Sequence, residues 1–240
     1  MAHFLLIPGA GGDAWYWYRV APLLEAAGHV AVSVPLPAGD ANAGIEEYAE
    51  VAVTAVDESG AAPATRWVVV GQSLGAFTAV ALATRIPIDL LVFVCAMIPK
   101  PGETPGQWWE ETGQESARIA AALAAGRDPE RAFDPLEVFL HDVPAEVVGE
   151  AEARGEFPQS DGPFARAWVP SAWAGIPTRA VVARDDRFFP LAFAQRLVRE
   201  RLRIEPDVVD SGHLPALAAP DELAALLIRY AEAATEHNLG

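Results

Sequence analysis

Six short runs of apolar residues recur along this chain, and their pattern limits what it can fold into. The middle four runs are β-branched and near-continuous rather than alternating, as expected for strands buried on both faces of a parallel sheet. The expected strands span residues 3–9, 29–36, 66–73, 89–97, 178–186 and 203–212. The pattern therefore predicts a mainly parallel sheet of six strands.

Segments with a helical period separate most of these runs. In five of them the apolar residues recur at spacings of three and four, which places them on one face of a helix. The expected helices span residues 15–28, 45–60, 74–86, 190–202 and 220–237. Because strands and helices alternate along the chain, we expect a doubly wound α/β structure.

One block breaks this alternation. Residues 99–175 contain many prolines, helical fragments such as 114–126 and no convincing strand. The block holds four of the seven tryptophans, which are Trp108, Trp109, Trp168 and Trp173. We interpret it as a helical lid inserted between the fourth and fifth strands of a core formed by residues 1–98 and 176–240. Its aromatic side chains either line a pocket or anchor the insertion to this core.

The charge of the chain argues against several classes of partner. A formal net charge of −16 repels the phosphates of nucleic acids and the surface of anionic lipids. No apolar run approaches the ~20 residues that cross a bilayer, and the first residues lack the basic region of a signal peptide. We therefore expect a cytoplasmic protein that acts on a small molecule, without nucleic acid or membrane as partner.

Cofactor chemistry also finds little support in the sequence. Cys95 is the single cysteine, so an intramolecular disulfide and a cysteine-based zinc cluster are excluded. No nucleotide-binding loop is complete, and we expect no cofactor or metal. The sequence leaves the oligomeric state open, with a homodimer as one alternative.

The stretch Gly71-Gln72-Ser73-Leu74-Gly75 has the pattern G-x-S-x-G. A valine-rich strand leads into it and a helix leaves it, which is the setting of a nucleophile elbow. So tight a turn needs glycine on either side, because a Cβ there would collide with the neighbouring strand and helix. The turn would raise the hydroxyl of Ser73 above the sheet, beside the N–H of Leu74. The alternative, in which Ser73 only caps a helix, is disfavoured by this context.

A serine nucleophile needs a base and an acid. Of the five histidines, His213 follows the last strand in a glycine-containing loop, at the edge where parallel sheets bind ligands. Asp185 and Asp186 compete at the end of the fifth strand, and Asp186 is favoured because a loop turning back at Pro190 suits it. Asp185 is expected to be a surface residue or to form a salt bridge with Arg184 or Arg187. The resulting order, Ser73, Asp186 and then His213, is that of the α/β-hydrolase arrangement.

The stretch LLIPGAGGDAWYWYRVAPLLEAAGHVAVSVPLPAG, residues 5–39, resembles the opening of small α/β-hydrolases related to plant methylesterases and hydroxynitrile lyases. The resemblance covers the core and not the insertion. It implies the spatial strand order 2-1-3-4-5-6, and it carries over the N–H of Ala10 as an oxyanion donor that works with the N–H of Leu74. Pro8 stands where these relatives usually have histidine, which leaves that backbone donor in place.

Fold alone does not decide the chemistry. Haloalkane dehalogenases and epoxide hydrolases of this fold have aspartate where this chain has Ser73. Hydroxynitrile lyases have threonine and lysine where it has Gly9 and Leu214. We therefore expect a serine esterase that cleaves a small, largely apolar ester, thioester or lactone through an acyl-enzyme. The alternative is a member that keeps the triad without hydrolysis, as a biosynthetic cyclase or a ligand receptor.

Five side chains are predicted to contact the substrate, namely Gln72, Trp15, Trp108, Trp109 and Leu214. Gln72 either lines the pocket or fixes the elbow in place. Trp15 either lines the acyl side of the pocket or packs in the first helix. Cys95 is expected to be a buried small hydrophobe rather than a second nucleophile.

Overall fold

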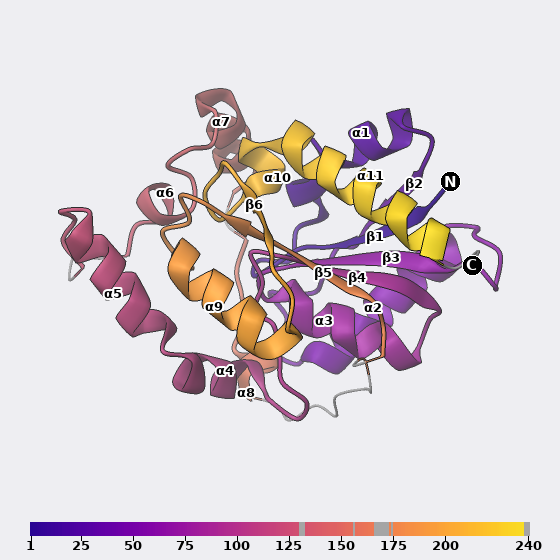
Figure 1. Ribbon diagram of the computed structural model, residues 1–240, viewed down its shortest axis with the longest axis horizontal. Coiled ribbons are helices and arrows are strands. Elements are labelled where there is room, and N and C mark those ends of the chain that lie inside the picture. Colours follow the sequence, from indigo (N-terminus) through magenta and orange to yellow (C-terminus); the bar gives the residue numbers. More distant parts are fainter. Residues whose placement is uncertain (130–132, 156, 166–172, 174, 238–240) are drawn as a thin grey trace.

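The computed structural model describes residues 1–129, 133–155, 157–165, 173 and 175–237, with the side chains of 235–237 excepted (Figure 1). Its strands are β1 (His3–Ile7), β2 (Val30–Ser33), β3 (Trp67–Gln72), β4 (Ile88–Val94), β5 (Thr178–Ala183) and β6 (Asp207–Val209). They form one sheet in the order β2-β1-β3-β4-β5-β6, and every neighbouring pair is parallel. The predicted fold class and strand order are confirmed.

Helices cover both faces of this sheet. On one face lie α2 (Ile45–Glu58), α3 (Gly75–Ala81) and α9 (Leu191–Leu202), and on the other lie α1 (Ala21–Ala26), α10 (Pro215–Ala218) and α11 (Pro220–His237) (Figure 1). Successive residues of β3 alternate between these layers, so that Val69 joins one core cluster while Val68 and Val70 join the other. Burial on both faces explains why this strand is apolar at nearly every position.

Three predicted elements are shorter than their sequence patterns. The expected helix 15–28 is a 3₁₀ helix, η1 (Ala14–Trp17), followed by α1, which begins at a turn containing Pro22. Helix α3 passes into a second 3₁₀ helix, η2 (Leu82–Thr84). The last strand keeps only Asp207–Val209, because Arg203 ends α9 in the left-handed region and Pro206 precedes the strand.

The block between β4 and β5 is helical where it is described. It contains α4 (Pro105–Thr112), α5 (Gln114–Ala124), α6 (Pro135–Val138), α7 (Ala145–Arg154) and α8 (Gly162–Ala165). These helices lie around one end of the sheet, at the left of Figure 1. Trp168 lies outside the described residues. The division of the chain into a core and a lid stays a prediction.

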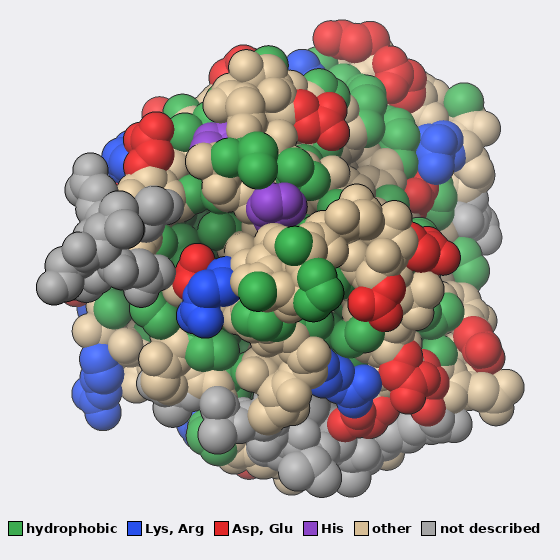
Figure 2. All heavy atoms as spheres, turned by 90° about the vertical axis from the view of Figure 1, so that its right-hand side faces the viewer, with side chains coloured by type: hydrophobic (Ala, Val, Ile, Leu, Met, Phe, Trp, Pro, Cys, Tyr) green, Lys and Arg blue, Asp and Glu red, His purple; other side chains and the backbone are tan. Residues whose placement is uncertain are grey.

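Acidic side chains are scattered over the face of the molecule at which the N-terminus lies (Figure 2). Figure 2 shows the face at which the N-terminus lies, where acidic side chains are scattered among hydrophobic ones and the described residues form no broad basic area. Within the described part of the chain, no helix is both long enough and apolar enough to span a bilayer. The predicted cytoplasmic location stays a prediction.

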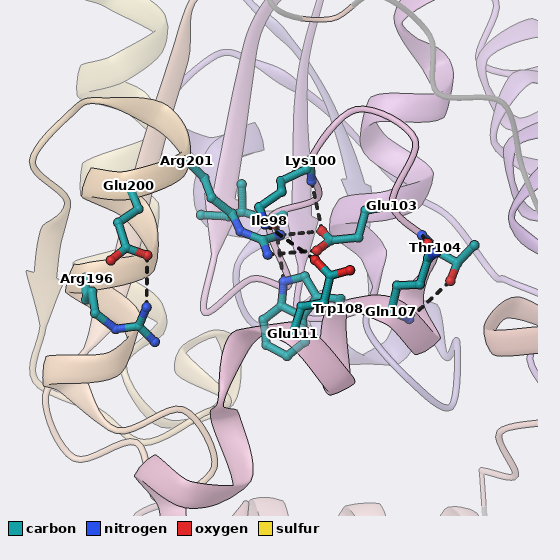
Figure 3. Close-up of polar contacts among 10 residues, drawn as sticks. All are labelled: Ile98, Lys100, Glu103, Thr104, Gln107, Trp108, Glu111, Arg196, Glu200 and Arg201. Carbon is teal, nitrogen blue, oxygen red and sulfur yellow. Dashed lines mark hydrogen bonds and ion pairs between the residues drawn. The ribbon is translucent and has the colours of Figure 1, made fainter.

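A buried ion pair fixes the start of the insertion to the core (Figure 3). The guanidinium of Arg201 on α9 donates to both carboxylate oxygens of Glu103, one of them at 2.8 Å, and to the carbonyl of Ile98. Both charged side chains are about 95% buried, with 5% and 4% exposed. Thr104 then caps α4, since its hydroxyl accepts the N–H of Gln107 at 3.1 Å. The insertion therefore leaves the core through a tightly fixed junction.

Candidate active site

Ser73 occupies a strained turn between β3 and α3. Its φ angle is +49°, in the left-handed region that residues with a Cβ rarely adopt. A Cβ at Gly71 would lie 2.9 Å from the Cβ of Ala79, and one at Gly75 would lie 2.3 Å from the carbonyl oxygen of Pro8. Glycine is thus required on both sides of the serine, which is the physical content of the G-x-S-x-G pattern.

Three side chains that are far apart in the sequence meet at this turn. The hydroxyl oxygen of Ser73 lies 3.1 Å from Nε2 of His213, and Nδ1 of the same ring lies 2.8 Å from Oδ2 of Asp186. All three residues are buried. With Nδ1–H donating to the carboxylate, the lone pair of Nε2 faces the hydroxyl, so that the ring can accept its proton.

Asp186 is held by the chain that follows it. Its second oxygen, Oδ1, accepts the N–H groups of Phe188 and Phe189, both at 2.8 Å. These bonds leave Oδ2 directed at the imidazole and satisfy the buried charge. Asp185, the competing residue, is exposed, which is the first of the two expected alternatives, and Arg184 pairs with Asp210 at 2.5 Å.

The loop after β1 approaches the elbow closely. A Cβ at Gly9 would lie 2.3 Å from Oε1 of Gln72 and 2.9 Å from the Cβ of Ser73, so only glycine allows this approach. Ala10 and Leu74 line the same cavity as Ser73. Among the described residues, neither of their N–H groups has a backbone or side-chain acceptor. The two groups are therefore available to a ligand beside the hydroxyl.

Gln72 joins the elbow to the histidine loop. It is 2% exposed, and its Nε2 donates to the carbonyl of His213 at 3.3 Å. The same side chain lines two cavities, so both predicted roles of Gln72 have a structural counterpart.

Two cavities adjoin this site. The first, called here the Ser73 cavity, has a volume of about 220 Å³ and is lined by Trp109 and Leu214 among others. The second, called here the Trp15 cavity, measures about 210 Å³ and is lined by Trp15 and again by Leu214. Four of the five predicted contact residues therefore face one cavity or both.

Trp108 is the exception, and the prediction for it is corrected. Its side chain is fully buried and its indole N–H donates to the carbonyl of Ile98 at 3.2 Å (Figure 3). The ring packs against Phe189 and Phe193, 5.3 and 6.0 Å away between centroids. Trp108 anchors the insertion to the core, because helical spacing in α4 directs it inward while Trp109 points to the cavity.

Sequence reasoning missed the residues that surround the histidine. The rings of Phe139, Phe188 and Phe189 lie 5.4, 5.1 and 4.9 Å from the His213 ring between centroids. Phe188 and Phe189, two and three residues after Asp186, were a usable signal, because they lie close behind the predicted acid in the sequence. Nothing in the sequence indicated Phe139, since it lies in the block between β4 and β5.

Asp142 was also missed. Its Oδ2 accepts the N–H of Gly212, the residue before His213, at 2.5 Å. The block between β4 and β5 thereby holds the loop that carries His213, and no sequence pattern marks this aspartate.

Cys95 is placed as a buried hydrophobe at the end of β4. Burial raises the pKa of its thiol well above the usual value, and the nearby carboxylate of Asp186 raises it further. The neutral thiol is a poor nucleophile. Among the described residues, no group of three or more His, Cys, Asp or Glu side chains is arranged to hold a metal ion.

A G-x-S-x-G turn with histidine and aspartate at the carboxyl edge of a parallel sheet is typical of α/β hydrolases, and comparison with known proteins agrees. Residues 4–226 match the model of the alpha/beta hydrolase family. The chain belongs to the alpha/beta hydrolase family, and the resemblance seen in residues 5–39 is confirmed.

Several proteins that are similar to this chain are named as esterases. The chain is 32% identical to Methylesterase 3 of Arabidopsis thaliana over 256 residues, covering 95% of each chain. It is 36% identical to Probable esterase PIR7A of Oryza sativa subsp. indica over 118 residues, and this match spans 45% of the chain and under half, 44%, of the relative. The solved structure of polyneuridine aldehyde esterase superposes with a TM-score of 0.76 at 21% identity, covering 96% of this chain and 99% of that one, which shows the shared fold.

Proposed function

We propose that this chain is a serine esterase that cleaves a small, largely apolar carboxylic ester, thioester or lactone. The single observation that carries the proposal is the chain of contacts from Ser73 through His213 to Asp186, at 3.1 and 2.8 Å. The esterase names of the relatives support hydrolysis of an ester bond.

The geometry supports a two-step mechanism. Nε2 of His213 takes the proton of Ser73 as the serine oxygen attacks the carbonyl carbon, and Asp186 stabilises the imidazolium. The oxyanion accepts hydrogen bonds from the N–H groups of Ala10 and Leu74, each worth about 10²–10³ in rate. His213 then gives the proton to the departing alcohol. Water, activated by the same ring, hydrolyses the acyl-enzyme and restores the serine.

The lining of the Ser73 cavity supports an uncharged substrate. Apart from the triad and Gln72, its described lining is formed by apolar side chains, including Met97, Phe164 and Phe188, and it includes no lysine or arginine. A charged group placed there would lose its hydration without gaining a partner.

Turnover of p-nitrophenyl acetate and butyrate tests the proposal. The wild-type protein should hydrolyse at least one of them, and Ser73→Ala should lower kcat by about 10³-fold or more, because the nucleophile is lost. Ser59→Ala, an exposed serine at the end of α2, is the matched control and should keep full activity. Absence of turnover with every short ester and thioester would overturn the proposal and favour the non-hydrolytic alternative.

A further inference from the structure

The two cavities adjoin each other at the loop after β1, which carries Ala10. The Ser73 cavity and the Trp15 cavity share four lining residues, which are Ala10, Gln72, Phe139 and Leu214. In the proposed mechanism the carbonyl of the substrate lies beside Ala10. Ser73 lines only the first cavity and Ala10 lines both, so an ester held between them has the first cavity on the serine side and the second beyond Ala10.

The two cavities are similar in size and chemistry. They measure about 220 and 210 Å³. An engineered apolar cavity of about 150 Å³ binds benzene, so each of these has room for a group of at least one six-membered ring. Trp109, Phe164 and Phe188 line the first beyond the junction, while Tyr16, Phe157 and Leu217 line the second.

The charged group at the Trp15 cavity is already paired. One carboxylate oxygen of Asp13 accepts the N–H of Trp15 at 2.9 Å, and the other accepts the guanidinium of Arg154 at 2.9 Å. A ligand in this cavity therefore meets apolar walls rather than an unsatisfied charge, which matches the Ser73 cavity on the other side.

We propose that the substrate is an ester with an apolar, ring-sized group on each side of the ester bond, one in each cavity. This inference rests on the proposed function and specifies its substrate class. Each group buries its own apolar surface. Filling one cavity should therefore lower kcat/KM by at least ~10-fold, and only for esters that place a group in that cavity.

Blocking the Trp15 cavity tests the inference. Ala151 on α7 lines that cavity, so that Ala151→Phe fills it, while Ala153→Phe on the same helix adds a ring at an exposed position. The probes are phenyl phenylacetate, with a ring on both sides, and methyl phenylacetate and phenyl acetate, with a ring on one side only. Each variant is compared with the wild type for each ester, which removes the difference in intrinsic reactivity.

We expect Ala151→Phe to lower kcat/KM at least ~10-fold for the two-ring ester and for one of the single-ring esters, and to leave the other within about twofold. The unaffected ester shows that the variant is folded and active. Ala153→Phe should leave all three within about twofold. An equal loss for all three esters, or no loss for the two-ring ester, overturns the inference. If the wild type hydrolyses p-nitrophenyl acetate but none of these three esters, the inference fails and the proposed function stands. If it hydrolyses neither, the proposed function itself fails.

Discussion

Gly212, the residue before His213, packs closely against the side chains of His141 and Asp142. A Cβ at this position would lie 2.6 Å from Oδ1 of Asp142 and 2.9 Å from Nε2 of His141. Gly212→Ala must therefore displace either these two side chains or the loop that carries His213, and the bond from the Gly212 N–H to Oδ2 of Asp142 holds the first of these side chains in place. Since a shift of about 1 Å in a catalytic group costs about 10²-fold, kcat for p-nitrophenyl acetate should fall by that factor.

Gly149→Ala is the control, because a Cβ there meets nothing within 4 Å. Circular dichroism of both variants should match the wild type. An activity of Gly212→Ala within twofold of the wild type would contradict the tight fit described for this loop.

At the scale of the elements, the ion pair between Glu103 and Arg201 joins the insertion to α9 (Figure 3). Glu103→Gln leaves the guanidinium of Arg201 buried without a counter-charge. Removing one partner of a buried pair costs about 3–5 kcal/mol, and we expect the free energy of unfolding to fall by about that amount in urea titrations.

An exposed pair on the same helix provides the comparison. Arg196 and Glu200 lie 2.9 Å apart with about half of each side chain exposed. Glu200→Gln should change the free energy of unfolding by less than about 1 kcal/mol. Equal effects of Glu103→Gln and Glu200→Gln on the free energy of unfolding would show that burial does not increase the cost of breaking the first pair.

The sheet was predictable from the sequence because its strands are buried on both faces, which leaves runs such as 67–70 apolar throughout. The helical character of the block between β4 and β5 was predicted, but the bounds of its short helices were not, since these follow local capping and long-range contacts. Trp108 shows the difficulty: two adjacent tryptophans look alike in the sequence, and only the packing of α4 on Phe189 and Phe193 separates the anchor from the cavity wall.

At the scale of the whole molecule, the parallel sheet brings the triad together. Ser73, Asp186 and His213 each follow the carboxyl end of a strand, and in a parallel sheet these ends meet at one edge. This is why three residues separated by as many as 140 positions could be selected from the sequence. The two cavities could not be predicted from the sequence, because they form where the block between β4 and β5 meets loops of the sheet. The bond from the N–H of Gly11 to Oε1 of Gln159, at 3.1 Å, is one such contact.

Covalent labelling by diisopropyl fluorophosphate tests most directly whether this convergence activates Ser73. The serine oxygen displaces fluoride from phosphorus only when a base takes its proton, so peptide mass spectrometry should find one label per chain, on the peptide that contains Ser73. His213→Ala should abolish the labelling. A label on a different residue, or equal labelling of Ser73 with and without His213, would contradict the assignment of these side chains as a catalytic unit.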